Sequence, residues 1–322
     1  MKNRKKYDIT QCALYKCRSR QRLSKLLMID YRQMMSKEYI SYHSRPKKKK
    51  KSNEVRIVTA PDKKLKAIQR RILKLLTHVT RPDWLMSGEK GKCYIDNGLA
   101  HINSKFLQTH DIEKFFDKCT REYVYRFFTE KLRTSRDVAS LLTDITTHNG
   151  KIPTGSPTSM MLAYYAYEDM FAGIIESNKK YDCISTVYVD DITASSQNAF
   201  NKSTLSYDIS QALNRYGHKL KSKKTRHYTP KKHKLVTGTV VTPNNMLDVP
   251  NSLQKDVIRG LLIANRKICK DLSDAEFAQE IDSLCGKIQA ARNINPNKYR
   301  EAQKFVIQLR KEIREKTIKS NP

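Results

Sequence analysis

Three aspartates are the residues of this sequence most able to do chemistry. Asp190 and Asp191 form the chain's only Asp-Asp dipeptide, between the β-branched runs 183–189 and 192–194. Asp111 ends another run, FLQTHD. Adjacent carboxylates repel each other unless a cation or a proton compensates their charge. Because the flanking residues are typical of buried strands, the pattern predicts a hairpin turn that brings carboxylates to the edge of a sheet.

These carboxylates have two interpretations. Asp tolerates turn geometry well, so a plain hairpin turn explains an Asp-Asp pair taken alone. Mg²⁺, however, usually takes one or two protein carboxylates and keeps coordination sites for water and substrate phosphates. Three aspartates on two adjacent strands would therefore hold two Mg²⁺ ions, one activating an attacking hydroxyl and the other stabilising a departing pyrophosphate. In this interpretation Asp111, Asp190 and Asp191 are catalytic residues and metal ligands.

The charge of the chain indicates the kind of substrate. Its 322 residues include 63 Lys and Arg against 32 Asp and Glu, a formal net charge of +31. Residues 1–51 hold 17 basic and 3 acidic residues, and residues 215–234 hold 9 basic residues and no acidic one. This surplus favours a polyanion such as nucleic acid, although an acidic membrane surface or solubility alone would also fit it. The lysine run 47–51 is either part of a nucleic-acid groove or a solvated loop.

The sequence argues against several other classes of protein. No segment approaches the ~18 consecutive apolar residues of a transmembrane helix. The basic N-terminus is not followed by the apolar stretch of a secretory signal. The seven cysteines are scattered, without CxxC or Cys/His metal spacing. We therefore expect a cytoplasmic protein with free thiols and without disulfides, structural zinc or a membrane partner.

The elements that must position the aspartates follow from hydrophobic spacing. Pro61 opens an expected helix whose apolar face holds Leu65, Ile68, Ile72 and Leu75. Besides the hairpin, strands are expected at 54–59, 105–109 and 235–241, and helices near 23–34, from 123, from the turn 155–157 through 172, and from 250 onward. The plan is therefore mixed α and β with an all-helical C-terminal part.

Four segments resemble the motifs of reverse transcriptases, in the order that this family shows. YVDD at 188–191 resembles the YxDD box, and DIEKFF at 111–116 resembles the upstream DxxxxF segment. IPTGSPTS at 152–159 resembles the PQGxPxSP turn, and GHKLKSKKT at 217–225 resembles the basic G…KT loop. One YxDD box is a weak signal, whereas four motifs in order are specific.

Two further segments resemble the reverse transcriptases of bacterial retrons. NGLAH at 97–101 resembles their NAxxH element, and VTG at 236–238 resembles the element that follows the palm. Three residues depart from the family pattern: Gly98 stands for the usual Ala, Thr154 for Gln and Met160 for Pro. The change at Thr154 bears on the contact to the template–nucleotide pair rather than on the reaction class.

The resemblance implies an α+β fold of the right-hand polymerase type. It implies a basic helical extension over 1–52, fingers and palm with an antiparallel sheet and helices over 53–245, and a helical, RNA-binding thumb over 246–322. It also implies that a structured non-coding RNA is copied from deoxynucleoside triphosphates, self-primed from an RNA 2′-hydroxyl, into a branched RNA–DNA hybrid (msDNA). Known retrons act in antiphage defence, where the enzyme and its hybrid restrain a toxic effector protein.

The resemblance assigns roles around the triphosphate, each with an ordinary structural alternative. Phe116 takes the place of the steric gate that excludes a 2′-hydroxyl, or is a core aromatic residue. Arg56 resembles the fingers arginine that grips the triphosphate, or is a surface residue at a strand edge. Gly155 fits a backbone that closely approaches a ligand, or a helix-start turn. Lys224 would steady the pyrophosphate, with Lys223 as competitor, unless both belong to a solvated loop.

Four more residues are candidates for nucleic-acid contacts. Asn97 and His101 would contact the structured RNA or order the palm. Thr237 and Gly238 would face the primer strand, or form a bulge in an ordinary strand.

Two other functions stay open on the sequence. One is a reverse transcriptase of another mobile element, such as an intron-encoded one. The other is a non-catalytic RNA-binding scaffold that restrains a toxin. A degenerate site would favour the scaffold, but all three aspartates are present.

Overall fold

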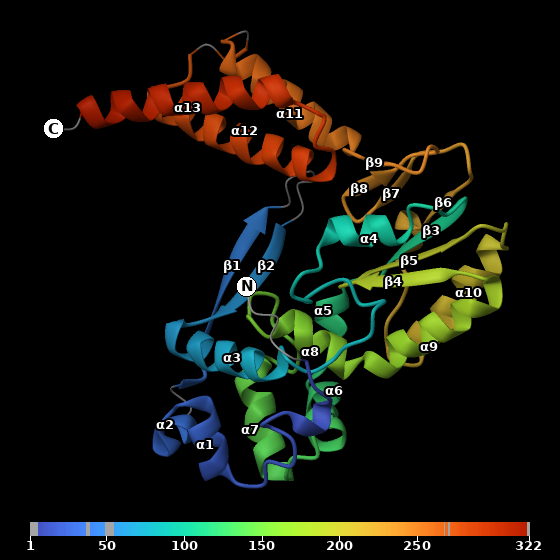
Figure 1. Cartoon of the computed structure of the whole chain (residues 1–322). Helices are drawn as coiled ribbons and strands as arrows, with labels where there is room; N and C mark the ends of the chain where they lie inside the picture. The colour runs from blue at the N-terminus through green and yellow to red at the C-terminus, as the bar shows by residue number, and fades with distance from the viewer. Residues whose placement is uncertain (1–5, 37–38, 49–54, 267, 270, 321–322) are drawn as a thin grey trace. The chain divides into compact units, whose positions relative to one another are not determined.

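The computed structural model describes residues 6–36, 39–48, 55–266, 268–269 and 271–320 (Figure 1). The chain divides into two compact units, the first comprising residues 1–93 and 108–227 and the second residues 94–107 and 228–322. Both contain helices and antiparallel strands. The expected α+β fold class is therefore confirmed.

The N-terminal segment is part of the core of the first unit. Its helices are the 3₁₀ turn η1 (Ile9–Gln11), α1 (Arg20–Leu27) and α2 (Tyr31–Met35). Leu23, Leu27 and Met34, which have helical spacing in the sequence, are buried in the main hydrophobic core. The spacing predicted helix here, and the structure divides it at Met28, whose positive φ of 58° ends α1.

A two-stranded antiparallel sheet follows. It consists of β1 (Tyr42–Lys48) and β2 (Val55–Pro61), with Lys47 opposite Arg56. β2 confirms the expected strand, whereas β1 was not predicted because its sequence YHSRPKK has no apolar alternation. The first two residues of the lysine run 47–51 lie in β1, and residues 49–51 lie outside the described residues.

Helix α3 (Lys63–Leu76) shows the expected apolar face. Leu65, Ile68 and Ile72 are buried. Asp62 is the N-cap before the helix, and its carboxylate accepts a 2.8 Å hydrogen bond from the Leu65 N–H. Pro61 is therefore the last residue of β2 rather than the first residue of the helix.

The four-stranded sheet that carries the aspartates has the order β4-β5-β3-β6. Its strands are β3 (Phe106–Asp111), β4 (Ile184–Tyr188), β5 (Asp191–Ser196) and β6 (Arg226–Tyr228). Val187, Ile192 and Ala194 are fully buried, as the apolar flanks of the Asp-Asp pair predicted. The carboxylates therefore stand at the end of strands that are fixed by the core.

The remaining helices of the first unit come from the centre of the chain. They are α5 (Phe115–Lys118), α6 (Arg121–Arg126), the π-helix η3 (Phe127–Lys131), α7 (Arg136–Thr146), α8 (Ser159–Ala166), α9 (Glu168–Asn178), the 3₁₀ turns η4 (Lys179–Tyr181) and η5 (Ser222–Lys224), and α10 (Lys202–Asn214).

The helix expected to run through residue 172 is instead divided at Tyr167. This residue has φ −122° and ψ 21°, which are not helical, and it separates α8 from α9. Its phenol oxygen accepts a hydrogen bond from the Thr120 N–H and donates one to the Lys118 carbonyl, each at 3.0 Å. At the break, the Tyr167 hydroxyl thus forms hydrogen bonds with two backbone groups at the end of α5 and just after it. The helical periodicity of the sequence does not predict these hydrogen bonds.

The second unit combines a small sheet with a helical region. Its elements are α4 (Tyr94–Ala100), β7 (Lys234–Val236), β8 (Thr239–Val241), β9 (Leu247–Asp248), α11 (Asn251–Ala264), α12 (Asp274–Ile294) and α13 (Arg300–Ser320). The last three share a core that includes Val257, Leu284 and Val306, and Figure 1 shows them side by side. The all-helical C-terminal part is thereby confirmed.

The single strand expected over 235–241 is wrong. Val236 pairs with Thr239, so this stretch is the β7–β8 hairpin with a two-residue turn at Thr237 and Gly238. Both turn residues have positive φ, 41° and 89°. Two consecutive positive φ angles are the pattern of a type I′ turn. The dipeptide Thr-Gly does not predict such a turn, because Asn-Gly and Asp-Gly are its common sequences.

Candidate active site

The β4–β5 hairpin places its carboxylates differently from the expected turn. Tyr188 pairs with Asp191, so the two turn residues are Val189 and Asp190, and Asp191 is the first residue of β5. Val189 has a φ of +60°. A positive φ at the first residue of a two-residue turn is typical of a type II′ hairpin, where Gly is usual. The hairpin is confirmed, but the turn lies one residue earlier than the Asp-Asp pair suggested.

Backbone hydrogen bonds bring Asp111 to this turn. The Ile112 N–H donates to the Asp190 carbonyl at 2.9 Å, on the side of the hairpin. On the other side, the Lys221 N–H donates to the Asp111 carbonyl at 2.8 Å. Asp111, the last residue of β3, and Ile112 after it are thus hydrogen bonded to the turn on one side and to the basic segment before Lys224 on the other. The structure therefore unites three sequence motifs that are far apart along the chain.

The electrostatics of the cluster show convergent negative charge. Burial raises the pKa of Asp191 to about 7, and the charges of Asp190 and Asp111 add to this rise while Lys224 opposes it. Such an elevation arises where carboxylates share a partly desolvated site. The charges of Asp111 and Asp190 thus both disfavour ionisation of Asp191.

Lys224 is a cation that contacts this cluster. Its ammonium group donates a hydrogen bond to the Asp111 carboxylate. Desolvation works against the charged form, but this bond and the charges of Asp111, Asp191 and Asp190 together raise the pKa of Lys224. The basic loop thus brings Lys224 to the carboxylates, where negative phosphate oxygens of a substrate would also be attracted.

The cluster offers hard oxygen ligands of the kind that Mg²⁺ prefers. Among the described residues, no three Asp, Glu, His or Cys side chains already converge as ligands of one ion. Mg²⁺ commonly binds one or two carboxylates and completes its shell with water and substrate phosphates. The carboxylates therefore fit an ion that is bound together with a nucleotide. Their mutual repulsion would be relieved by such a cation.

The two neighbouring phenylalanines of α5 have different surroundings. Phe115 is buried and packs against Tyr167, Phe171 and the His218 ring, with centroid distances of 6.2, 5.9 and 5.2 Å. Phe116 is only partly buried. Phe115 is thus a core residue, whereas Phe116 packs against that core and stays partly accessible.

Gly155 approaches another strand closely. A Cβ added to it would lie 2.6 Å from the Thr59 carbonyl oxygen and 2.9 Å from the Ala60 Cβ. Its own N–H donates to that Thr59 carbonyl at 2.8 Å. Gly155 therefore lets the turn before α8 pack on β2. Arg56 lies in the same strand, but its side chain is outside what the structure describes.

The other candidate residues gather in the second unit. The Asn97 side-chain amide donates to the Thr237 hydroxyl at 2.8 Å, so the NAxxH-like and VTG-like segments contact each other. Asn97 and His101 are fully buried, and burial lowers the pKa of His101 to about 3. Gly238, at the tip of the turn, is exposed. Of these four residues, Gly238 is the one that is exposed to solvent.

Gly98 has a packing reason for departing from the family's usual Ala. A Cβ on Gly98 would lie 2.3 Å from the Thr239 hydroxyl oxygen and 3.2 Å from Leu247 Cδ2. The Thr239 side chain therefore occupies the space where an Ala methyl group would stand.

Ser87 is a residue of the site that the sequence did not indicate. Its hydroxyl oxygen accepts a 2.9 Å hydrogen bond from the Val189 N–H, at the first position of the β4–β5 turn. The only signal in the sequence is the Ser87-Gly88 pair after an apolar run, and such a pair marks a turn without naming its partner.

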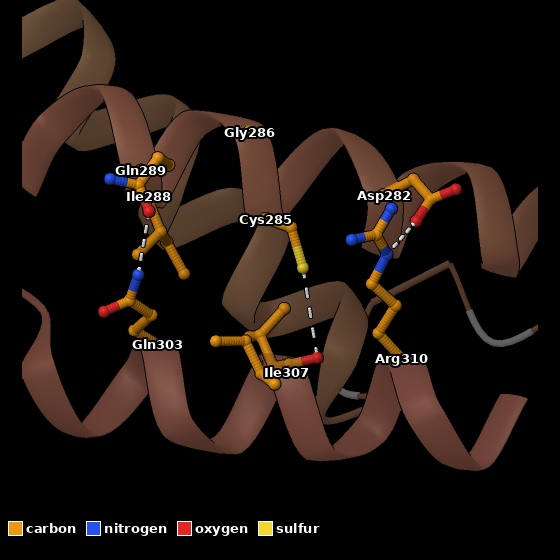
Figure 2. A pocket seen from close by; sticks show the side chains of 9 residues that line it. Asp282, Cys285, Gly286, Ile288, Gln289, Gln303, Ile307 and Arg310 are labelled. Carbon is orange, nitrogen blue, oxygen red and sulfur yellow. Dashed lines mark hydrogen bonds and ion pairs between the residues drawn. The ribbon is translucent and has the colours of Figure 1, made fainter. Parts of the chain in front are cut away.

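A groove between α12 and α13 is not part of this chemistry. It has a volume of about 350 Å³ and is lined by residues of the two helices, among them Cys285, Ile288 and Ile307 (Figure 2). Asp282 pairs with Arg310, and Gln303 donates to the Gln289 side-chain oxygen at 3.0 Å. Because these polar groups satisfy one another, the groove presents no uncompensated charge for catalysis.

The chain matches one protein family over most of its length. Residues 46–254 match the family model described as reverse transcriptase (RNA-dependent DNA polymerase). This range contains the three aspartates, the turn before α8 and the basic loop.

Relatives come from bacterial retrons. The retron Ec86 reverse transcriptase of Escherichia coli is 28% identical over 197 residues, which are 61% of each chain. The retron Se72 reverse transcriptase of Salmonella heidelberg (strain 579083-10) is 28% identical over 147 residues, 45% of this chain and 39% of that one. The retron Ec83 reverse transcriptase of Escherichia coli is 27% identical over 278 residues, 82% and 85%. The match thus spans less than two thirds of the Ec86 and Se72 proteins.

A solved structure supports the fold. The apo telomerase from Candida Tropicalis, truncated from its C-terminal domain, aligns with a TM-score of 0.50 over 67% of this chain and 56% of that one, at 10% identity. Such a likeness bears on the fold alone, and it confirms an α+β fold of the polymerase type.

Proposed function

Because the chain belongs to the reverse transcriptase (RNA-dependent DNA polymerase) family, we propose that it is a retron RNA-directed DNA polymerase acting by nucleotidyl transfer. One observation carries the proposal. Asp190 lies in the β4–β5 turn and Asp191 directly after it, and the Asp190 carbonyl accepts a hydrogen bond from the residue that follows Asp111. The Lys224 ammonium group contacts the Asp111 carboxylate. The substrates would be an RNA template and deoxynucleoside triphosphates.

Reverse transcriptases use divalent metal ions, and we propose two Mg²⁺ ions here. The chemistry that these ions supply when bound is activation of the attacking hydroxyl and stabilisation of the departing pyrophosphate. Asp111 and Asp190 would hold them first, with Asp191 as the third ligand. The raised pKa of Asp191 supports this assignment, because a cation would relieve the repulsion that causes it.

The remaining side chains would act on the nucleotide. Lys224, now hydrogen bonded to Asp111, would turn its charge to the pyrophosphate oxygens. Phe116 would lie against the sugar and reject a 2′-hydroxyl. Arg56 would contact the triphosphate from β2, to whose end the turn at Gly155 is hydrogen bonded.

Different segments of the chain would have different roles in binding and copying the nucleic acid. We assign residues 53–245 to fingers and palm, residues 246–322 to a thumb and residues 1–52 to a basic N-terminal extension. The sequence of α13 is rich in Lys and Arg, which suit recognition of an RNA stem by shape and phosphate contacts. The exposed turn at Gly238 would approach the primer strand.

The retron assignment also specifies the product and its setting. We propose that a structured non-coding RNA serves as template and primer, that DNA grows from its 2′-hydroxyl, and that the branched hybrid (msDNA) helps to restrain an effector protein in antiphage defence. The similarity to three retron enzymes supports this. No helix among the described residues is long and apolar enough to span a bilayer. Cytoplasmic action is proposed because the substrates are there.

The product tests this assignment. The gene would be expressed together with the DNA directly upstream of it, and nucleic acid would be extracted from the cells. We expect a short DNA that gains mobility after ribonuclease treatment and keeps a branched ribonucleotide at its 5′ end. A polymerase that extends added primers but yields no branched product would contradict the retron type while leaving the polymerase activity intact.

A further inference from the structure

We propose that Ser87 is a positioning residue that fixes the conformation of the catalytic turn at Val189 and Asp190. This inference rests on the proposed polymerase function and adds to it a residue outside the four motifs. Ser87 is nearly buried, with 8% of its surface exposed, and does not belong to a helix or strand.

The turn needs support because of its sequence. Val189 is a β-branched residue with a φ of +60°, at a position where Gly is usual. Residues held in such regions of backbone space persist only where their surroundings impose them, and they concentrate at active sites. Asp190 follows directly, so any relaxation of Val189 would reorient this carboxylate.

Ser87 supplies that support through one hydrogen bond. Its Oγ accepts from the Val189 N–H at 2.9 Å. On the opposite side of the turn, the Asp190 carbonyl accepts from the Ile112 N–H at 2.9 Å. The turn is therefore held between two contacts, one from the strand segment that carries Asp111 and one from Ser87.

The segment that carries Ser87 is itself joined to the edge of the sheet. Leu85 forms a parallel bridge with Val187 of β4. The Val187 N–H donates to the Trp84 carbonyl, and the Met86 N–H donates to the Val187 carbonyl, each at 2.9 Å. Ser87 thus follows directly after the residues that pair with Val187, and its hydroxyl accepts the hydrogen bond from the turn that follows β4.

A buried ion pair fixes the two ends of the same segment. The Arg81 and Glu89 side chains are both almost fully buried and form a hydrogen-bonded ion pair. Lys6 contacts the other carboxylate oxygen of Glu89 at 2.8 Å. Because the ends are fixed, the Ser87 hydroxyl has a defined position, as a supporting residue for a catalytic group must have.

The test compares Ser87→Ala with a matched serine. Ser24 has the same 8% exposure and donates a 2.8 Å hydrogen bond to the Ile29 carbonyl, in a loop after α1. Each variant would extend oligo(dT) on poly(rA) with dTTP and Mg²⁺. We expect Ser87→Ala to lower kcat about 10- to 100-fold, as expected for a displaced catalytic group, with little change in KM. Ser24→Ala should keep the wild-type kcat, and the melting temperatures of the two variants should be similar.

Two further variants separate positioning from simple packing. Ser87→Thr keeps the hydroxyl and should retain most of the wild-type kcat. Val189→Gly removes the backbone strain, so adding Ser87→Ala to it should reduce kcat by a smaller factor than in the wild-type chain.

The outcomes distinguish this inference from the function on which it rests. No extension by the wild-type chain would overturn the proposed function and the inference with it. An active wild type with equal kcat in Ser87→Ala would overturn the inference alone. The inference would also be overturned if Ser87→Ala lowered kcat by the same factor in the wild-type and Val189→Gly backgrounds and Ser87→Thr lowered kcat equally.

Discussion

The Asn97 side-chain amide lies 2.8 Å from the Thr237 hydroxyl oxygen and joins two sequence motifs that are 140 positions apart. Asn97 is fully buried, and Thr237 has a positive φ of 41° at the first position of the β7–β8 turn. The hydrogen bond therefore stabilises a turn conformation that a β-branched residue rarely adopts. It also indicates that the retron-like motifs act first as parts of one folded unit.

Removal of this hydrogen bond should destabilise the protein. In Asn97→Ala the Thr237 hydroxyl loses its partner, and we expect the free energy of unfolding to fall by about 1–3 kcal/mol. Urea unfolding followed by circular dichroism measures the change. Asn265→Ala is the control, because its amide donates to the Leu261 carbonyl from an exposed position and should cost little. Equal stability of both variants would argue against the structural role of Asn97.

Gly98→Ala restores the residue usual in the family and should nevertheless be unfavourable here. The new methyl group would lie 2.3 Å from the Thr239 hydroxyl oxygen, so we expect a loss of about 1–3 kcal/mol in the free energy of unfolding. Gly286→Ala, within α12 and with nothing near its Cβ position, should be neutral or stabilising by up to about 1 kcal/mol. The double change Gly98→Ala with Thr239→Ala should recover part of the loss, and a neutral Gly98→Ala would contradict this packing.

Stability should decrease with falling pH because several histidines, His101 and His218 among them, are buried in the neutral form. Burial lowers the pKa of His101 to about 3, and burial together with the Lys118 charge lowers the pKa of His218 to about 4. Unfolding exposes both, and the unfolded chain then binds protons below about pH 6.5. From pH 6.5 down to about 4, each should therefore reduce the free energy of unfolding, by at most about 1.4 kcal/mol per pH unit.

Urea unfolding between pH 7 and 4.5 measures this slope. Among the described residues, the buried nitrogens of His218 have no hydrogen-bond partner, so His218→Leu should make the slope shallower. His43→Gln, at an exposed position of β1, serves as the control. A slope that is unchanged by His218→Leu would contradict the assignment.

Phe116 and Phe115 offer a matched pair for the nucleotide gate. Phe116→Ala should raise the incorporation of ribonucleotides relative to deoxynucleotides, because a partly exposed ring would no longer meet the 2′-hydroxyl. Phe115→Ala removes a core ring and should cost about 3–5 kcal/mol of stability without a specific gain in ribonucleotide use. Primer extension with each nucleotide type measures the ratio, and an unchanged ratio in Phe116→Ala would remove the gate from that position.

Local sequence patterns predicted the elements whose structure depends on periodicity. The apolar face of α3, the β4–β5 hairpin and the C-terminal helices all follow from spacing of apolar residues. β1 was missed because its pairing with β2 depends on the partner strand rather than on its own basic sequence. The segments that carry the three aspartates could be picked out because each motif is itself a local segment.

Contacts between distant residues could not be predicted in this way. The division at Tyr167 depends on the backbone around Thr120, and the turn at Thr237 depends on the Asn97 amide. Ser87 contacts Val189 across 102 positions, and no pattern in either segment marks the other. Side chains that support a site from outside its motifs need coordinates to be found.

The most direct test of the account is RNA-templated DNA synthesis by the purified chain and its Asp190→Asn variant. With poly(rA), oligo(dT), dTTP and Mg²⁺, we expect extension by the wild-type chain and a rate at least about 10³-fold lower in the variant, since one metal-binding carboxylate is lost. Asp169→Asn, which removes an exposed partner of Lys131, should extend at the wild-type rate. Extension by Asp190→Asn at the wild-type rate would contradict the proposed active site.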